Sequence, residues 1–155
     1  MGMGCSDPTS ATDSITDAPV AVTTGRRSIE TPHAIVAGRS GLAVVELRSD
    51  EPSCTGLPTP EDGHVAVTIS VPADRVVVGR QDIESDPLRD DDVGLSVTMY
   101  GGSGGEGGST TYIVTTGVLE LDAVDAHEIR GGIRARDDVN DVGVDGRFSA
   151  MRCVE

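Results

Sequence analysis

The sequence predicts an all-β domain, an antiparallel sandwich or barrel of about eight to nine short strands, preceded by a disordered N-terminal tail. Valine is the commonest apolar residue, and β-branched side chains fit a pleated sheet better than a helix. Short apolar segments, several of them alternating with polar residues, are separated by glycine, proline or aspartate. No segment sustains the i, i+3, i+4 apolar pattern of an amphipathic helix. Strands with turn residues at each break are typical of sandwiches and barrels.

The composition divides the chain near residue 30. Residues 1–30 are rich in Ser, Thr, Asp, Ala and Pro and show no sustained apolar period, so we interpret them as a flexible tether. The apolar residues 20–22 could instead form a first strand. The composition changes at Thr31, and the length fits one domain, which we expect to span residues 31–155.

The expected strands follow the apolar segments in order. The clearest is residues 64–71, in which four β-branched apolar residues alternate with Ala, Thr and Ser, the signature of a half-buried strand. The glycine-rich stretch 101–109 is a flexible connection by composition. The other expected strands cover residues 34–37, 42–47, 75–79, 95–99, 111–115, 118–121, 131–135 and 146–150.

The last two expected strands form a closing hairpin. Residues 131–135 and 146–150 share the pattern Gly-x-apolar-x-Ala, with a polar turn between them. Phe148 is the only phenylalanine available to the core. Period-two alternation places Val144 and Ala150 on its inward face and Cys153 on the opposite face.

The charge narrows the function classes. The net charge is −14, and all 12 basic residues are arginine. Such a surface repels phosphate backbones, so we expect no nucleic-acid partner. No apolar run approaches the length of a transmembrane helix. The absence of lysine, with arginine retained, can reflect a GC-rich coding bias. An acidic, lysine-free surface is also typical of a high-salt habitat.

Two cysteines lie in the body of the chain. We expect Cys54, in the proline-rich loop 49–63, and Cys153, after the last strand, to form a disulfide. A bridge closing ~100 residues contributes roughly 4–5 kcal/mol in the chain-entropy model. Because disulfides persist in oxidising compartments, this pairing implies export from the cytoplasm. The alternative is two unrelated thiols.

The third cysteine, Cys5, has two lipid interpretations. In the first it is the lipidated residue of a prokaryotic lipoprotein, which would need signal-peptide regions upstream that this sequence does not contain. In the second, residues 1–6 match the myristoylation pattern M-G-x-x-x-[ST], with Cys5 as a palmitoylation site. Two acyl chains anchor stably where one does not. An ordinary tail cysteine is the third alternative.

The final turn is the best metal candidate. Closely spaced oxygen ligands can hold Ca²⁺, although the spacing does not match an EF-hand loop and a solvated, charge-dense turn is the alternative. No other cofactor is expected. The candidate ligands are Asp137, Asp138, Asn140, Asp141 and Asp145.

The chain resembles the small, uncharacterised envelope lipoproteins of high-GC bacteria. The residues that carry the resemblance are Cys5, the Ser/Thr/Asp-rich tether, the valine-rich domain and the closing strand Gly-x-Phe-x-Ala-x-x-Cys over residues 146–153. The resemblance covers the two ends and the general composition. It implies a location at the cell envelope, anchored or secreted to the periplasm or surface, and no known activity.

No motif of an enzyme is visible. The sequence lacks G-x-S-x-G, and it offers almost no aromatic residues to line an organised pocket. We therefore expect a non-enzymatic binding or structural module, tethered to a membrane through Cys5 and with an unknown surface partner. The alternative is a Ca²⁺-dependent extracellular interaction domain that uses residues 137–145. A hydrolase with an unrecognised site is the third hypothesis.

Overall fold

The described part of the chain is almost entirely β-structure. The structure is a computed structural model that describes residues 15–153 except residues 26, 40, 52–62, 84–92 and 101–108. The single short helix among them is η1 (Ala73–Arg75). The strands are β1 (Ala21–Thr24), β2 (Arg27–Glu30), β3 (His33–Arg39), β4 (Leu42–Arg48), β5 (Val65–Pro72), β6 (Gly79–Asp82), β7 (Gly94–Tyr100), β8 (Ser109–Ile113), β9 (Gly117–Val124), β10 (Glu128–Asp137) and β11 (Val142–Arg152).

The strands form one open, curled sheet, which confirms the all-β prediction. Its order is β6-β9-β10-β11-β3-β4-β5-β7-β8, and β1 and β2 branch from β11. Neighbouring strands are antiparallel except β11 and β3, which are parallel. The sheet is therefore mixed, whereas the sequence predicted a purely antiparallel one.

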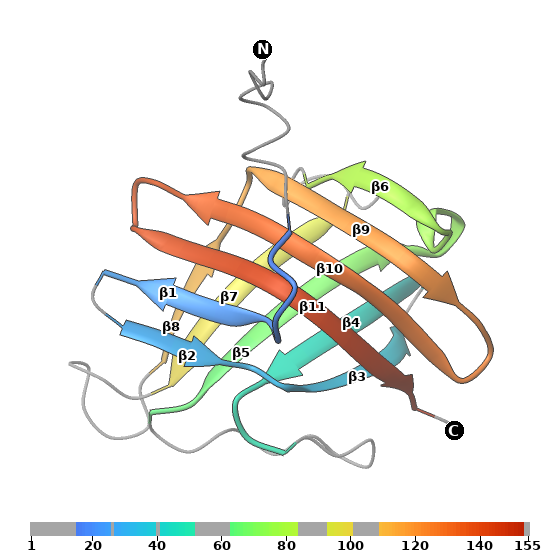
Figure 1. Cartoon of the computed structure of the whole chain (residues 1–155), viewed down its shortest axis with the longest axis horizontal. Coiled ribbons are helices and arrows are strands. Elements are labelled where there is room, and N and C mark those ends of the chain that lie inside the picture. Colours follow the sequence, from blue (N-terminus) through green and yellow to red (C-terminus); the bar gives the residue numbers. More distant parts are fainter. Residues whose placement is uncertain are drawn as a thin grey trace.

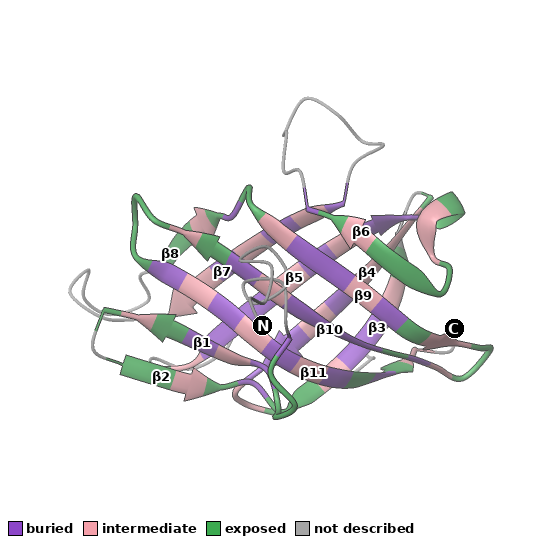
Figure 2. Cartoon of the chain, turned by 45° about the horizontal axis from the view of Figure 1, so that its top comes forward, coloured by how far each residue is buried: buried purple, intermediate pink, exposed green. Residues whose placement is uncertain are grey.

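The curl brings the two halves of the sheet face to face. In Figure 1, β9, β10 and β11 cross in front of β4, β5 and β7. Apolar side chains from both halves form one core between them. Buried and less buried residues alternate along the strands (Figure 2). The alternation predicted for β5 is confirmed, because its four alternating β-branched apolar residues are all buried.

Strand β11 joins the two halves. One of its edges pairs with β10 along ten residue pairs. The other edge is shared by β1, which pairs with Val142 to Asp145, and by β3, which pairs only with Met151 and Arg152. Because β11 is paired on both edges, it is an interior strand although it comes last in the chain.

Between β1 and β3, the edge of β11 is covered by residues 15–20, which we call the N-terminal strap. The Arg147 amide donates to the Ala18 carbonyl at 2.7 Å, and the Thr31 amide donates to the Val20 carbonyl at 2.7 Å. Thr16 hydrogen-bonds through its amide and its hydroxyl to the Asp145 carboxylate. In Figure 1 the strap crosses in front of β10 and β11.

The strap corrects the predicted tether boundary. Residues 15–30 belong to the domain and were wrongly assigned to the tether, since Val20 and Val22 are core residues. The alternative of a first strand at residues 20–22 is the better one, because β1 covers Ala21–Thr24. The composition of residues 15–30 did not indicate a folded segment, because only a few apolar residues, separated by Thr and Asp, anchor it to the core. Residues 1–14 lie outside the described residues.

The expected strand at residues 75–79 is wrong. The chain forms η1 there and then a bend, and β6 begins only at Gly79. Val76 packs against the core, whereas Val77 and Val78 are exposed. The three consecutive valines resemble a buried strand in sequence, but the turn that leads from β5 to β6 leaves two of them in solvent.

The closing hairpin is confirmed. Strands β10 and β11 pair in register, with Gly131 opposite Phe148 and Ala135 opposite Val144. Phe148 is 8% exposed and packs in the core together with Val144 and Ala150, as the alternation predicted. A glycine is required at position 146 of β11, because its φ is +143° and its backbone lies directly against the strap.

We expect Gly146→Ala to destabilise the protein by roughly 2–4 kcal/mol. A Cβ at this position would lie 2.5 Å from the Val20 Cα and 2.6 Å from the Pro19 carbonyl oxygen, which are backbone atoms that cannot rotate away. Urea unfolding measures the loss. The matched control is Gly38→Ala on β3, where a Cβ would meet nothing within 4 Å. Equal stability of the two variants would contradict the close approach at Gly146.

Candidate functional site

The outer surface of β6, β9, β10 and β11 carries most of the ion pairs seen in the described part of the chain. We call it the charged face. Its basic and acidic side chains come from alternate, outward-pointing positions of neighbouring strands. The residues that form it are Arg80, Glu120, Asp122, Glu128, Arg130, Arg134, Arg136, Asp145 and Arg147.

Arg147 connects three strands of the charged face. From β11 its guanidinium reaches over β10 and donates to Glu120 at 3.1 Å and to Asp122 at 3.0 Å, both on β9. Arg80 on β6 donates to the other oxygen of Glu120 at 3.1 Å. The reach is available because the residue between them on β10 is Gly132, whose Cβ would lie 3.3 Å from the guanidinium.

Gly132 also seats the start of the strap. A Cβ there would lie 2.8 Å from the Ile15 Cγ2 atom, and Ile15 is buried. Ile15 and the Arg147 guanidinium therefore share the space above one glycine. The strap and the ion-pair network are neighbours on the same surface.

The network lowers the pKa of one carboxyl group. Hydrogen bonding from Arg147, followed by that from Arg80, lowers the pKa of Glu120 below its usual value of 4.5, against the opposing effect of burial. The same hydrogen bond raises the pKa of the Arg147 guanidinium. Glu120 is thus ionised whenever the folded protein is at neutral pH.

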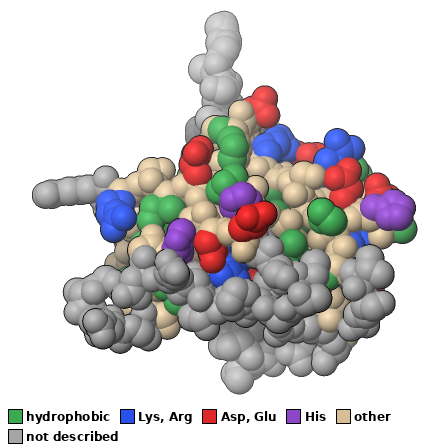
Figure 3. All heavy atoms as spheres, turned by 90° about the horizontal axis from the view of Figure 1, so that it is seen from below, with side chains coloured by type: hydrophobic (Ala, Val, Ile, Leu, Met, Phe, Trp, Pro, Cys, Tyr) green, Lys and Arg blue, Asp and Glu red, His purple; other side chains and the backbone are tan. Residues whose placement is uncertain are grey.

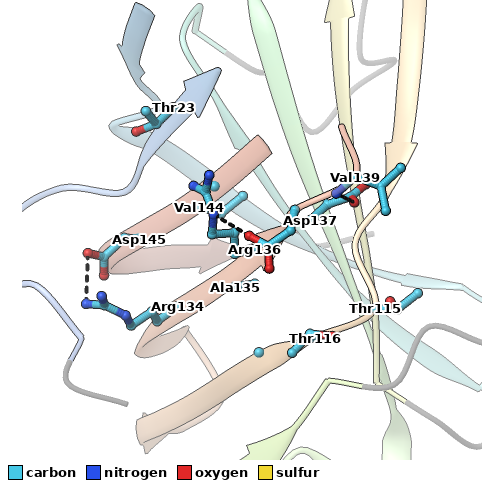
Figure 4. A pocket seen from close by; sticks show the side chains of 13 residues that line it. Thr23, Thr115, Thr116, Arg134, Ala135, Arg136, Asp137, Val139, Val144 and Asp145 are labelled. Atoms are coloured by element: carbon cyan, nitrogen blue, oxygen red, sulfur yellow. Dashed lines mark hydrogen bonds and ion pairs between the residues drawn. The ribbon is translucent and has the colours of Figure 1, made fainter. Parts of the chain in front are cut away.

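A groove lies at the hairpin end of the charged face (Figure 4). Arg134 pairs with Asp145 at 3.6 Å, and Arg136 donates to Asp138 at 2.7 Å and to Asp141 at 2.6 Å. Threonine hydroxyls complete a polar lining without aromatic residues. The lining residues are Thr23, Thr115, Thr116, Gly117, Arg134, Ala135, Arg136, Asp137, Asp138, Val139, Gly143, Val144 and Asp145.

The predicted calcium ligands do not converge. Asp137 accepts hydrogen bonds from the amides of Val139 and Asn140 and from the Asn140 side chain, which closes the turn. These hydrogen bonds lower the pKa of Asp137, and the bond from the Asn140 side chain has the largest effect. Within residues 137–145 and the rest of the described chain, no group of three or more His, Cys, Asp or Glu is placed to hold a metal ion.

The arginines of β10 account for this arrangement of the carboxylates. Asp138 and Asp141 bind Arg136, and Asp145 binds Arg134 and the strap. The sequence shows a run of oxygen ligands but not the cations that lie beside them across the hairpin. The acidic turn is therefore an ion-paired β-turn, in which Asp141 adopts the left-handed conformation at φ 55°.

A Ser–His contact at the far end of β4 and β5 was not predicted. Ser49 Oγ and His64 Nδ1 are 2.9 Å apart, which is the geometry of a nucleophile and its base. The Val65 amide also donates to Ser49 Oγ at 2.9 Å, so the hydroxyl closes the ladder between the two strands. The contact is better explained as a structural cap of the β4–β5 pair than as a hydrolase site.

Beside it lies a buried ion pair. Arg48 is 1% exposed and donates two hydrogen bonds of 2.7 Å to Asp50. The pairing lowers the pKa of Asp50 and raises that of Arg48. Where described residues form the surface seen from below, acidic, basic, histidine and hydrophobic side chains lie interspersed (Figure 3). A bidentate pair of this kind holds a buried guanidinium in place.

The structure places one of the three cysteines. Cys153 follows β11, is half-buried, and donates its amide to the Val36 carbonyl at 2.8 Å. Cys5 and Cys54 lie outside the described residues, so the predicted disulfide and lipid anchor stay predictions. No helix in the described part of the chain is long and apolar enough to cross a membrane.

Comparison of the chain with known protein families, with curated proteins and with solved structures finds no significant match.

The charged face and its groove were not predicted from the sequence. The only trace in the sequence is Gly132, which lies between Arg147 of β11 and Glu120 of β9. These neighbours can be recognised only when the register of the three strands is known.

We expect Arg147→Gln to lower the free energy of unfolding by about 1 kcal/mol near neutral pH, since it removes two partly exposed ion pairs. Because the pKa of Glu120 is lowered in the folded state, its stabilisation is complete above about pH 4.5 and is lost as the pH falls through the folded-state pKa. The difference between wild type and variant should therefore shrink below that pH in urea unfolding.

The control is Arg27→Gln on β2, which removes the same charge from an exposed arginine that makes no ion pair with the described residues. It should change stability little at either pH. A pH-independent deficit in Arg147→Gln would show that the arginine acts through packing of its stem and not through Glu120.

Proposed function

We propose that this protein is a non-enzymatic binding or structural module of a bacterial cell envelope, tethered through a lipid on Cys5. The observation that carries the proposal is the N-terminal strap. It holds the chain against the outer side of β10 and β11 as far as Ile15, so the sequence that contains Cys5 is continuous with the charged face.

The length of the intervening sequence limits the distance to a membrane. Ten residues lead from Cys5 to Ile15, and a fully extended chain covers at most ~3.3–3.6 Å per residue. A lipid on Cys5 would thus keep Ile15 within roughly 35 Å of the bilayer surface. The charged face, against which Ile15 packs at Gly132, would be the part of the domain held nearest to the anchor.

The proposed disulfide fits the place of Cys153. The two halves of the sheet are joined where β11 meets β3, and that junction has only the pairs Met151 with Ile35 and Arg152 with Val36. Cys153 comes directly after it. A covalent bond from Cys153 to Cys54 would hold the chain beside this junction, and it would add roughly 4–5 kcal/mol to the stability of the whole fold in the chain-entropy model, because it restricts the unfolded chain. Such a bond persists in the oxidising compartments outside the cytoplasm.

The binding surface in this proposal is the groove on the charged face. Its guanidinium and carboxylate groups pair with one another but stay partly exposed, and with the threonine hydroxyls they offer both donors and acceptors, which suits a polar partner rather than an apolar one. The calcium-dependent alternative has less support, because the carboxylates of residues 137–145 already bind arginines and turn amides. The hydrolase hypothesis has only the Ser49–His64 contact in its favour.

Detergent phase partitioning tests the anchor. The gene is expressed in a high-GC bacterial host with its upstream chromosomal region retained, and the protein is followed by immunoblot. We expect wild type to enter the detergent phase and Cys5→Ala to stay in the aqueous phase, because only Cys5 carries the acyl chains.

Two variants control the experiment. Ser6→Ala changes the neighbouring residue and should partition like wild type. Gly2→Ala removes the acceptor of the myristoylation alternative and should also partition like wild type. Aqueous partitioning of wild type and Cys5→Ala alike would reject the anchor, and loss of partitioning in Gly2→Ala would favour the alternative.

A further inference from the structure

Strand β8 is an open end of the sheet. Among the described residues three strands have a partner on one edge only: β6, which pairs with β9; β2, which pairs with β1; and β8, which pairs with β7. An open edge presents unpaired backbone donors and acceptors to any extended chain. The chemical character of each edge decides whether such a chain can bind.

Two of the three edges carry the features that prevent pairing. β6 and β2 have four residues each, and each carries an arginine and an acidic residue. β8 has five residues, Ser109 to Ile113, without charge, proline or glycine. The uncharged sequence continues to residue 119 in a chain of which 25% of the residues are charged. Among these edges β8 alone lacks the usual protection against edge-to-edge pairing.

The backbone groups that point outward from β8 follow from its pairing with β7. The Val114 amide donates to the Leu95 carbonyl of the β7 side. In an antiparallel pair every second residue bonds to the neighbour, so Thr110 and Tyr112 point toward β7. The amides and carbonyls of Ser109, Thr111 and Ile113 therefore point away from the sheet.

We propose that β8 pairs with β8 of a second copy of this chain, antiparallel and about a two-fold axis at Thr111. The two Thr111 residues would exchange both of their outward hydrogen bonds, and Ile113 would pair with Ser109 of the second copy in the same way. The exposed side chain of Ile113, 49% accessible, gains a cross-strand neighbour. The sheets of the two copies become one continuous sheet.

The charge distribution makes this edge suitable for contact between two copies. Each chain carries a net charge of −14, so contact through most faces brings like charges together. The β8 edge avoids this, because residues 109–119 contain no charge that would face its equivalent. An antiparallel strand edge is also complementary to itself, as a two-fold interface requires.

Sedimentation velocity over a range of protein concentrations tests the proposal. We expect a reversible monomer–dimer equilibrium that strengthens with salt, because salt screens the repulsion between two acidic copies. Thr111→Asp places two carboxylates opposite each other at the axis and should weaken dimerisation by ~10-fold or more. Ser28→Asp adds the same charge to the exposed edge strand β2 and should leave the equilibrium unchanged.

A second variant separates edge pairing from any loss of folding. Thr111→Pro removes an amide that points away from β7, which an edge strand tolerates, and should abolish dimerisation with unchanged circular dichroism. Thr111→Val keeps the amide and should dimerise like wild type. Hydrogen exchange gives an independent readout, because the amides of Thr111 and Ile113 should exchange quickly in dilute protein and slowly in concentrated protein.

Three results would overturn the proposal. One is a monomer at every concentration and salt. Another is a dimer that Thr111→Asp and Ser28→Asp affect equally. The third is slow exchange of the Thr111 amide in the monomer, which would mean that a segment of the same chain already covers β8.

Discussion

The structure depends on hydrogen bonding along both edges of β11. One edge belongs to β10 alone, whereas the other is divided among β1, the strap and β3. This strand therefore fixes the N-terminal segment, the closing hairpin and the junction between the two halves of the sheet. Because β11 is the last strand and pairs with β1, β3 and β10, the core is complete only when the C-terminal residues are in place. Folding therefore depends on pairings between residues far apart in the sequence.

Scarcity of aromatic residues shapes the rest of the packing. Only 2% of the residues are aromatic, and the core is filled mainly by Val, Leu and Ile. Backbones approach closely where glycine allows it: a Cβ on Gly131 would lie 2.2 Å from the Glu120 carbonyl oxygen, and one on Gly146 would meet the strap. Glycine also matters on the charged face, since Gly132 lets the Arg147 guanidinium reach β9. Close backbone packing and the Arg147 ion pairs thus both depend on glycines of the closing hairpin.

Alternation and turn residues were enough to predict the all-β class, β5 and the closing hairpin, because one face of each strand is buried and the period survives in the sequence. Three features were not predictable for physical reasons. The parallel contact of β11 with β3 depends on which edges meet in space. The exposed Val77 and Val78 resemble core residues, because composition does not reveal a turn. The ion pairs of Asp138 and Asp145 depend on cross-strand register with the arginines of β10, so the sequence does not show that these carboxylates have cationic partners.

The most direct test of the central role of β11 is native-state hydrogen exchange of the Arg147 amide, which donates to Ala18 of the strap. If the strap is an integral part of the sheet, this amide should exchange only through global unfolding, as slowly as the amide of Arg152, which donates to His127 next to β10. Fast exchange of Arg147 beside a slow Arg152 would show that the strap opens independently. It would then contradict the assignment of residues 15–20 to the domain.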